Sequence, residues 1–287
     1  MRAVCLLHED RVEGRAVAVM DRALLETQHA FDGVATDYHR SNAENPLLCA
    51  MRERTLAALT AQVSPGARIL NLGCGPGSDD EVLGRQGHRV TAIDWSPAMV
   101  AEARRRIQLA GLEDRVDVHH LGIHELDRLR PAVFDAACSN FGPLNCVPSL
   151  TDSARLIAER VRAGGVLVAS VIGRVCPWEL ALYSWRGNWK RLRVRFVEDA
   201  VPVPLSGRTV WTRYYTPAAF EQAFASAGFA RVSLRALGLF VPPPYMQAFA
   251  GRHPALIARM QWLDDRLGHR PGLRQWGDHF LMVLRKT

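Results

Sequence analysis

The sequence contains no long apolar run. Its longest apolar stretch extends from about Val166 to Ile172 and is interrupted by Ser170, whereas a membrane-spanning helix needs about 20 consecutive apolar residues. The first residues, Met1 to Asp10, hold too short an apolar region for a signal peptide and reach acidic side chains at once. Hydrophobic residues make up 48% of the chain, which is ordinary for a globular protein with a core. We therefore expect a cytoplasmic protein without a membrane span.

Cysteine pairs at metal-binding spacing are also missing. The six cysteines are widely separated and none forms a C-x-x-C pair, so a structural zinc site is not expected. His120 and His124 stand four residues apart but lack a third ligand at the spacing of H-E-x-x-H. Wide spacing in a chain without a signal sequence favours free thiols, and we predict no metal site.

Lysine is nearly absent, and the basic charge is unevenly distributed. Only Lys190 and Lys286 occur, so arginine supplies almost all of the 36 basic residues. Residues 174–287 hold 17 Lys and Arg against 7 Asp and Glu, whereas residues 1–173 hold 19 against 22. A basic half suits a nucleic-acid or other anionic partner. Because no nucleic-acid-binding motif accompanies it, we interpret these arginines as a solvated surface.

Three alternating glycines form the most informative feature that is present. The apolar run from Ala67 to Leu70 leads into Asn71-Leu72-Gly73-Cys74-Gly75-Pro76-Gly77, a pattern typical of a buried strand that ends in a tight turn. Glycine there permits positive φ and lets a ligand approach the backbone. A second strand, Arg89 to Asp94, ends in a carboxylate 21 residues after Gly73. At about this spacing an acidic side chain accepts hydrogen bonds from ribose hydroxyls.

Strand and helix patterns alternate through the centre of the chain. Strands are predicted at 68–72, 89–94, 116–119, 134–139 and 166–172, with helices at 78–86, 97–110 and 149–162. Ser96 and Gly111 suit the two ends of the 97–110 helix. This alternation predicts an α/β fold with a doubly wound, mostly parallel sheet. Ligands bind such sheets at the carboxyl ends of the strands, here residues 71–77, 94–95, 120–124 and 139–145.

The glycine pattern resembles that of a known enzyme family. The spacing G-x-G-x-G, followed by Val90 to Met99, is similar to the first two motifs of class I S-adenosylmethionine-dependent methyltransferases. The dinucleotide pattern G-x-G-x-x-G is absent, which disfavours a nicotinamide-dependent oxidoreductase. Phe31 to Tyr38 resembles the N-terminal helix of the small-molecule, ubiquinone-biosynthesis branch, and Tyr214 to Phe229 resembles the family's return to its last strands. The resemblance implies a Rossmann-like sheet of seven strands and S-adenosylmethionine as cofactor.

The same resemblance suggests how the chain is divided. Residues 1–60 would form an N-terminal extension and cap helices, and residues 61–173 the cofactor-binding core. Residues 174–287 would complete the sheet, interrupted by inserts at 174–209 and 240–278 that form a lid over the acceptor. We expect one helix over 178–193, a loop over 198–207, a strand over 210–215 and one or two helices over 246–267.

The resemblance also implies the roles of particular residues. The glycine loop would support the methionine part of the cofactor, Asp94 its ribose and Trp95 its adenine. Asn71 stands where the family more often has an acidic residue, and Ile123 where it often has Asp. The predicted cofactor-binding residues are Tyr38, Arg40, Asn71, Gly73, Cys74, Gly75, Gly77, Asp94, Trp95, Met99, Gly122, Ile123, His124, Asn140 and Phe141.

The methyl acceptor is less well defined by the sequence. Asn140-Phe141-Gly142-Pro143 departs from the Asn/Asp-Pro-Pro-aromatic signature of enzymes that methylate nucleic-acid bases, which disfavours that class. We predict a small apolar, aromatic or acidic acceptor contacted by Asn145, Trp178, Tyr183, Tyr214 and Tyr245. The candidate general bases are His120, His124, Tyr214 and Tyr215, and the sequence does not choose among them. An RNA or protein methyltransferase that uses the basic C-terminal part, and a non-catalytic cofactor-binding module, are the alternatives.

Overall fold

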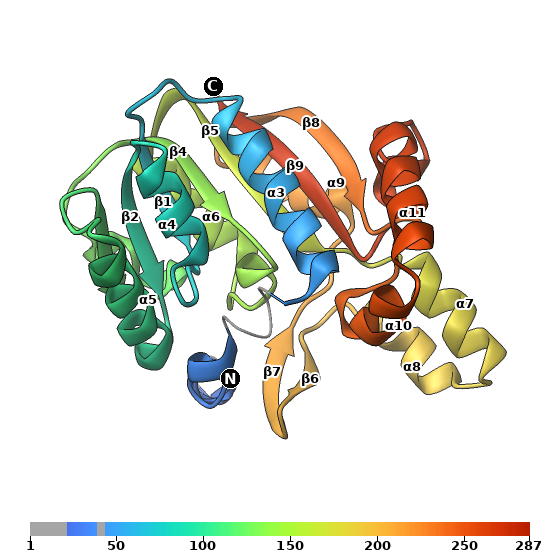
Figure 1. Cartoon of the computed structure of the whole chain (residues 1–287). Helices are drawn as coiled ribbons and strands as arrows, with labels where there is room; N and C mark the ends of the chain where they lie inside the picture. Colours follow the sequence, from blue (N-terminus) through green and yellow to red (C-terminus); the bar gives the residue numbers. More distant parts are fainter. Residues whose placement is uncertain (1–21, 39–43) are drawn as a thin grey trace, which may run out of the picture.

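A single seven-stranded sheet forms the centre of the molecule. The computed structural model describes residues 22–38 and 44–287, and the strand order of the sheet is β3-β2-β1-β4-β5-β9-β8 (Figure 1). Strands β1 to β5 pair in parallel, while β9 runs antiparallel to both β5 and β8. The strands are β1 (Arg68–Leu72), β2 (Arg89–Asp94), β3 (Val116–His120), β4 (Phe134–Ser139), β5 (Val161–Ile172), β8 (Phe229–Leu237) and β9 (His279–Lys286). The predicted α/β fold with a mostly parallel sheet is confirmed.

Helices cover both faces of the sheet and bury its apolar side chains. Helices α3 (Pro46–Thr60), α4 (Ser78–Arg85) and α5 (Pro97–Ala110) contribute to one buried cluster, which includes Leu59, Leu83 and Ile107. Helices α6 (Leu150–Arg160) and α9 (Pro217–Ala225) contribute to the other cluster. Both clusters also contain alternate residues of the central strands, because successive strand side chains point to opposite faces.

The predicted helix caps are present where the sequence placed them. The Ser96 side chain accepts a hydrogen bond from the Met99 backbone N–H at the start of α5, and Gly111 ends that helix with a φ of 63°. Asn45 caps α3 in the same way, by accepting from the N–H groups of Leu47 and Leu48. Local signals therefore fix where these helices begin and end.

The C-terminal part differs from the sequence prediction in two places. The helix expected over 178–193 is divided into α7 (Pro177–Trp185) and α8 (Trp189–Arg193), because Gly187 adopts a φ of 62° between them. The loop expected over 198–207 contains strand β6 (Val201–Leu205), which pairs with β7 (Arg208–Thr212) in a hairpin separate from the main sheet. Ser206 and Gly207, both with positive φ, form the turn of this hairpin.

The segment between β8 and β9 packs on helix α3. Helices α10 (Gln247–Arg252) and α11 (Pro254–Leu267) contribute Ala250 and Ile257 to a small cluster with Leu47 of α3. Within the described part of the chain, no helix is both long enough and apolar enough to cross a membrane.

Candidate functional site

A large open cavity lies at the carboxyl ends of the parallel strands. It contains about 1450 Å³ of empty space, its open mouth included. Its walls include residues 73–76 after β1, 94–96 after β2, 121–124 after β3 and 140–143 after β4, together with Ile172 at the end of β5. The cavity therefore lies at the sheet edge that the alternation of strands and helices predicted.

The glycine loop forms the floor of the cavity with its backbone. Gly73, Gly75 and Gly77 all have positive φ, between 54° and 77°. A Cβ at Gly73 would lie 2.4 Å from the side chain of Pro143, whereas a Cβ at Gly75 would have no other atom within 4 Å. Gly73 is thus required by close packing, and Gly75 leaves open space where a ligand can approach the backbone.

Asp94 connects the loop to the second strand. Its two carboxylate oxygens accept hydrogen bonds from the backbone N–H groups of Gly75 and Ser96, each at 2.8 Å. Removal from water raises the pKa of Asp94, and these two hydrogen bonds oppose that shift. Because each carboxylate oxygen can accept more than one hydrogen bond, Asp94 can hold the loop and still accept from a ligand in the cavity.

An ion pair that the sequence analysis did not find lines the cavity beside the loop. Arg52 of α3 donates from Nε to Asp79 Oδ1 at 2.6 Å, and Asn140 donates from Nδ2 to Asp79 Oδ2 at 3.0 Å. The Arg52 guanidinium also lies 5.1 Å from the centre of the Phe141 ring. Phe141 has a φ of 63°, an unfavourable value for a residue other than glycine. These side chains bring one anion and one cation together at the cavity wall.

Asn71 takes part in a buried group behind that wall. Its Nδ2 donates to Asp80 Oδ1 at 2.7 Å, and its Oδ1 accepts from the Cys138 thiol at 3.4 Å. Asp80 is fully buried, and burial raises its pKa to about 7. Asn71 itself is not among the residues that line the cavity. The structure thus directs the Asn71 amide toward Asp80, away from the cavity to which the sequence analysis had assigned it.

Aromatic side chains surround the other end of the cavity. Trp95 packs edge-on against His124 at 4.9 Å between ring centres, and both line the cavity. On its other side Trp95 stacks on the exposed His120, whose Nε2 lies 3.0 Å from the Trp95 carbonyl oxygen. Met99 and Ile123 complete this apolar end. The Trp95 Nε1 and the Asn140 Oδ1 are buried and have no hydrogen-bond partner among the described residues, so both are available to a ligand.

Two segments far apart in the sequence also line the cavity. Residues 22–32 are helical, and Leu24, Thr27 and Phe31 face the cavity together with Val203 and Leu205 of the hairpin. We call these two segments the roof, and direct contacts join them. Trp211 donates from Nε1 to Glu26 Oε2 at 2.7 Å and from its backbone N–H to Thr27 Oγ1 at 3.0 Å, and Arg208 donates to the His29 carbonyl oxygen.

Most predicted cofactor-binding residues lie together at the cavity. Those that line it are Tyr38, Gly73, Cys74, Gly75, Asp94, Trp95, Met99, Gly122, Ile123, His124, Asn140 and Phe141. Gly77 lies just behind the wall as the residue that precedes α4. Arg40 lies outside the described residues. The chemical role of each of these residues stays a prediction.

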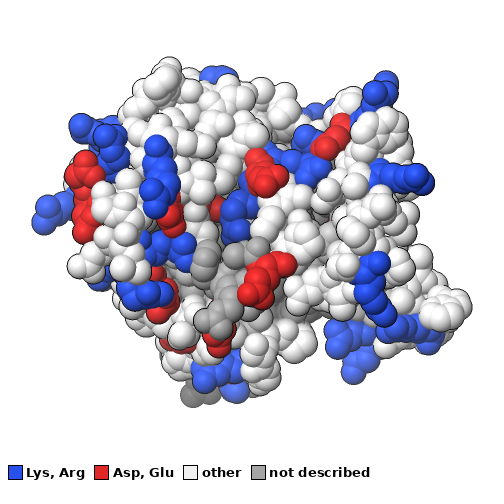
Figure 2. All heavy atoms as spheres, in the orientation of Figure 1, with Lys and Arg blue, Asp and Glu red and all other residues white. Residues whose placement is uncertain are grey.

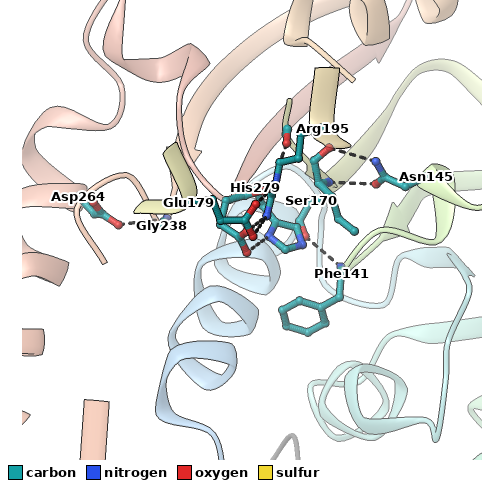
Figure 3. A network of polar contacts seen from close by, with 11 residues as sticks. Phe141, Asn145, Ser170, Glu179, Arg195, Gly238, Asp264 and His279 are labelled. Atoms are coloured by element: carbon teal, nitrogen blue, oxygen red, sulfur yellow. Dashed lines mark hydrogen bonds and ion pairs between the residues drawn. The ribbon is translucent and has the colours of Figure 1, made fainter. Parts of the chain in front are cut away.

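The predicted acceptor-binding residues lie elsewhere. Asn145, Trp178, Tyr183, Tyr214 and Tyr245 are all described, and none of them lines the cavity. Asn145 hydrogen-bonds with both the N–H and C=O of Ile172 and donates to the Arg213 carbonyl oxygen, so its amide joins backbone segments (Figure 3). Trp178 donates to the Phe240 carbonyl oxygen at 2.7 Å. Asn145 and Trp178 thus hold backbone segments outside the cavity.

One of the four candidate general bases lines the cavity. His124 lines it, whereas His120, Tyr214 and Tyr215 do not. Burial raises the pKa of Tyr214 to about 12 and also raises that of Tyr215. Both tyrosines are therefore protonated near neutral pH and poorly suited to accept a proton.

A buried charge network joins α7 to β9. Arg195 forms ion pairs with Glu179 at 2.7 Å and Asp278 at 2.6 Å, and His279 contacts the other oxygen of Asp278 (Figure 3). Ligand atoms of Cys176, Glu179 and Asp278 lie within 4.8 Å of one another, close enough to hold a metal ion. The Arg195 guanidinium already pairs with both carboxylates, so their oxygens take part in a buried ion-pair network.

Comparison with known proteins shows which sequences resemble this chain. Residues 69–165 match the model of a family described as a methyltransferase domain. The ubiquinone biosynthesis O-methyltransferase of Xylella fastidiosa is 41% identical over 112 residues, which cover 38% of this chain and 43% of that protein. The protein of the same name from Xanthomonas campestris pv. campestris is 33% identical over 148 residues, or 50% of this chain and 59% of that one. The chain spans about half the length of the curated relatives that it matches.

A solved structure extends the likeness beyond the matched region. The 1,6-didemethyltoxoflavin-N1-methyltransferase of Burkholderia thailandensis, solved with 1,6-didemethyltoxoflavin and S-adenosylhomocysteine bound, superposes with a TM-score of 0.57. The superposition covers 93% of this chain and 88% of that one, at 20% identity. At this low identity, the superposition shows a shared fold alone. Together the comparisons confirm the resemblance predicted from the glycine motif and its neighbours.

Proposed function

Because residues 69–165 match a methyltransferase domain, we propose that this chain transfers the methyl group of S-adenosylmethionine to a small apolar acceptor. The observation that carries the proposal is the cavity at the strand ends, where the glycine loop and Asp94 meet. An open space beside Gly75 and a carboxylate with free acceptor capacity are what an adenosyl ligand needs there.

Asp94 and the aromatic end are proposed to hold the adenosine. The Asp94 carboxylate accepts from the ribose hydroxyls while it keeps its hydrogen bonds to the loop. Trp95, Ile123 and Met99 supply apolar surface for the adenine. The unpartnered Trp95 Nε1 and the side chain of His124 provide polar contacts at its edge.

The pair of Arg52 and Asp79 is proposed to hold the amino-acid end of the cofactor. That end carries an ammonium and a carboxylate, and the cavity wall offers one group of each opposite charge. The unpartnered Asn140 Oδ1 beside Asp79 is a further acceptor for the ammonium. The anion that the family more often places at the position of Asn71 is thus replaced by Asp79, eight residues later and at the cavity wall.

The roof and the end of β5 are proposed to enclose the acceptor. Leu24, Phe31, Val147, Ile172 and Val203 give this part of the cavity an apolar lining, which suits an uncharged acceptor with an aromatic or aliphatic body. A sulfonium supplies a methyl group already attached to a good leaving group. The protein residues have two tasks, to align the acceptor for in-line attack and to exclude water, and alignment alone can contribute effective molarities of about 10⁵ M or more.

The relatives support an oxygen atom as the acceptor. The matched curated proteins are named for O-methylation in ubiquinone biosynthesis, and we extend this chemistry to the present chain. Among the described candidates, His124 is the one at the cavity to receive the hydroxyl proton. The five described cysteines are free thiols, which supports the proposed cytoplasmic location. We propose no nucleic-acid substrate.

Binding and turnover test the proposal separately. Titration calorimetry with S-adenosylmethionine, S-adenosylhomocysteine and NAD should give heat with the two adenosyl ligands and none with the dinucleotide. Methyl transfer from labelled S-adenosylmethionine should then be detected with a panel of phenols and catechols of increasing apolar size. Asp79→Asn and Arg52→Gln should each weaken S-adenosylhomocysteine more than adenosine, because adenosine lacks the amino-acid end. Binding of NAD alone would contradict the proposal.

A further inference from the structure

The turn between α7 and α8 exposes tryptophan and basic side chains together. Residues 184–191, which we call the α7–α8 tip, are all exposed. Trp185 is 83% exposed and Trp189 60% exposed, and Arg186, Lys190 and Arg191 lie beside them in the chain. The tip contains no acidic residue. The two tryptophans stand four residues apart in the chain. Single exposed apolar side chains are normal on protein surfaces, whereas grouped ones mark an interaction site.

The helix that leads to the tip has no buried residue, although its sequence is mostly apolar. Helix α7 reads PWELALYSW, and none of its residues is buried. Its first turn is half-buried, with Trp178 packed near Phe249, whereas its last residues, Ser184 and Trp185, are exposed. The base of the helix is nevertheless held firmly, because Glu179 pairs with the buried Arg195 at 2.7 Å. The exposed end is therefore presented on a fixed support.

The tip lies away from the cavity. No residue of 177–197, all of which the structure describes, lines the cavity. Figure 1 shows α7 and α8 at the outer end of the molecule, and Figure 2 shows Lys and Arg side chains gathered at that corner. The exposed tryptophans are thus not explained by the proposed cofactor or acceptor.

We propose that the α7–α8 tip docks on the surface of a membrane that contains anionic lipids. Tryptophan side chains favour the boundary between headgroups and acyl chains, and Lys and Arg are attracted to anionic headgroups. Segments that lie on a membrane without crossing it combine these two features. The tip supplies both within eight residues.

Two other occupants suit the tip less well. Proteins that bind single-stranded nucleic acid use a basic groove that follows the backbone, whereas the tip is a turn at the outer end of the molecule. A second copy of this chain, docked tip to tip, would bring like charges together without any acid in the tip to offset them. An anionic lipid surface meets both the charge and the apolar side chains.

Vesicle binding by the whole chain tests the proposal. Sedimentation would compare vesicles of phosphatidylcholine alone with vesicles that also contain phosphatidylglycerol. The protein should partition onto the mixed vesicles, bind the neutral ones weakly, and lose affinity as salt is raised. Lys190→Gln with Arg191→Gln should weaken binding to the mixed vesicles roughly 20- to 30-fold, from about fivefold for each basic residue. Trp185→Ser with Trp189→Ser should abolish the blue shift of tryptophan emission on binding.

A matched variant tests whether any exposed tryptophan and arginine would act in the same way. Trp262 of α11 is 54% exposed, and the Arg266 guanidinium lies 4.7 Å from its ring centre. Trp262→Ser with Arg266→Gln should leave vesicle binding unchanged. All variants should keep their affinity for S-adenosylhomocysteine, so that failure of this proposal is distinguished from failure of the proposed function. Equal binding to both vesicle types, equal binding by the tip variants, or selection of a single-stranded RNA in place of vesicles would overturn it.

Discussion

Replacement of Asp94 gives the most direct test of the proposed ligand geometry. The carboxylate already accepts two backbone N–H groups at 2.8 Å, so its remaining lone pairs are the ones directed to the ribose. A hydrogen bond to a charged group contributes about 1.5–3 kcal/mol. Asp94→Ala should therefore weaken S-adenosylhomocysteine binding roughly 10- to 150-fold, as measured by titration calorimetry.

The same substitution also removes the support of the glycine loop, and the design must separate these two effects. Loss of the loop contacts with Gly75 and Ser96 weakens every ligand that rests on the loop, whereas loss of the ribose contacts weakens only a ligand with ribose hydroxyls. The measurement is therefore repeated with the 2′,3′-dideoxy analogue of S-adenosylhomocysteine. The variant should lose much less affinity for the analogue than for the parent ligand.

An exposed carboxylate on the neighbouring strand provides the control. Asp117 of β3 pairs with His119 and does not line the cavity, so Asp117→Ala should bind both ligands as the original chain does. An equal loss of affinity for the parent ligand and its dideoxy analogue in Asp94→Ala would refute the ribose contact. Melting temperatures of both variants establish that they remain folded.

Three further predictions concern stability and ligand exchange. Burial raises the pKa of Asp80 to about 7 from an ordinary value of 3.8, so the folded state keeps a proton that the unfolded chain loses, and stability falls as pH rises from about 4 to about 7. Asp80→Asn should remove this pH dependence and raise the melting temperature at pH 8. An unchanged pH profile of the melting temperature would contradict this cause. In urea titrations, Gly73→Ala should lower the free energy of unfolding by about 2–5 kcal/mol, because the new Cβ meets Pro143 at a positive φ. Gly75→Ala should lower it less, because its Cβ meets no other atom. Equal losses would show that contact with Pro143 does not determine the cost. Trp211→Phe should speed dissociation of S-adenosylhomocysteine in stopped-flow experiments with little change in melting temperature, and an unchanged rate would show that the roof does not limit release.

The parts of the site that could be predicted from sequence are those set by short-range rules. The turn after β1, the carboxylate at the end of β2 and the cap at Ser96 depend on residues within a few positions of one another. Backbone conformation at a glycine and hydrogen bonding at a helix start are determined locally. The parallel sheet could also be predicted, since its strands and helices alternate in clear hydrophobic patterns along the chain.

The charged pair at the cavity wall required the tertiary structure. Arg52 belongs to a cap helix and Asp79 to the first turn of α4, so their contact depends on how α3 lies across the sheet. One signal was available, because an acidic residue directly after a glycine loop lies near any ligand at that helix start. Asn71 was predicted at the cofactor, and the sequence did not show that its amide would donate to Asp80, because a residue at the end of a strand can point to either face.

The aromatic residues of the C-terminal part show the limit of arguments from composition. Trp178 and Tyr214 were predicted at the acceptor because aromatic side chains are common in ligand pockets. In the structure, Trp178 hydrogen-bonds the chain near Phe240, and Tyr214 lies under the Arg195 guanidinium. Strand β6 of the hairpin lines the cavity but was predicted as a loop, because Pro202 and Pro204 disfavour strands except at free edges.

The roof joins stretches of chain that lie about 180 residues apart, and this separation has a consequence for the order in which the molecule assembles. Because closing a long loop costs entropy, we expect these contacts to form after the central strands have paired. We therefore expect the roof to form last, and to open by breaking a few hydrogen bonds while the sheet stays intact. S-adenosylhomocysteine could then leave, and S-adenosylmethionine enter, without unfolding of the domain that binds them.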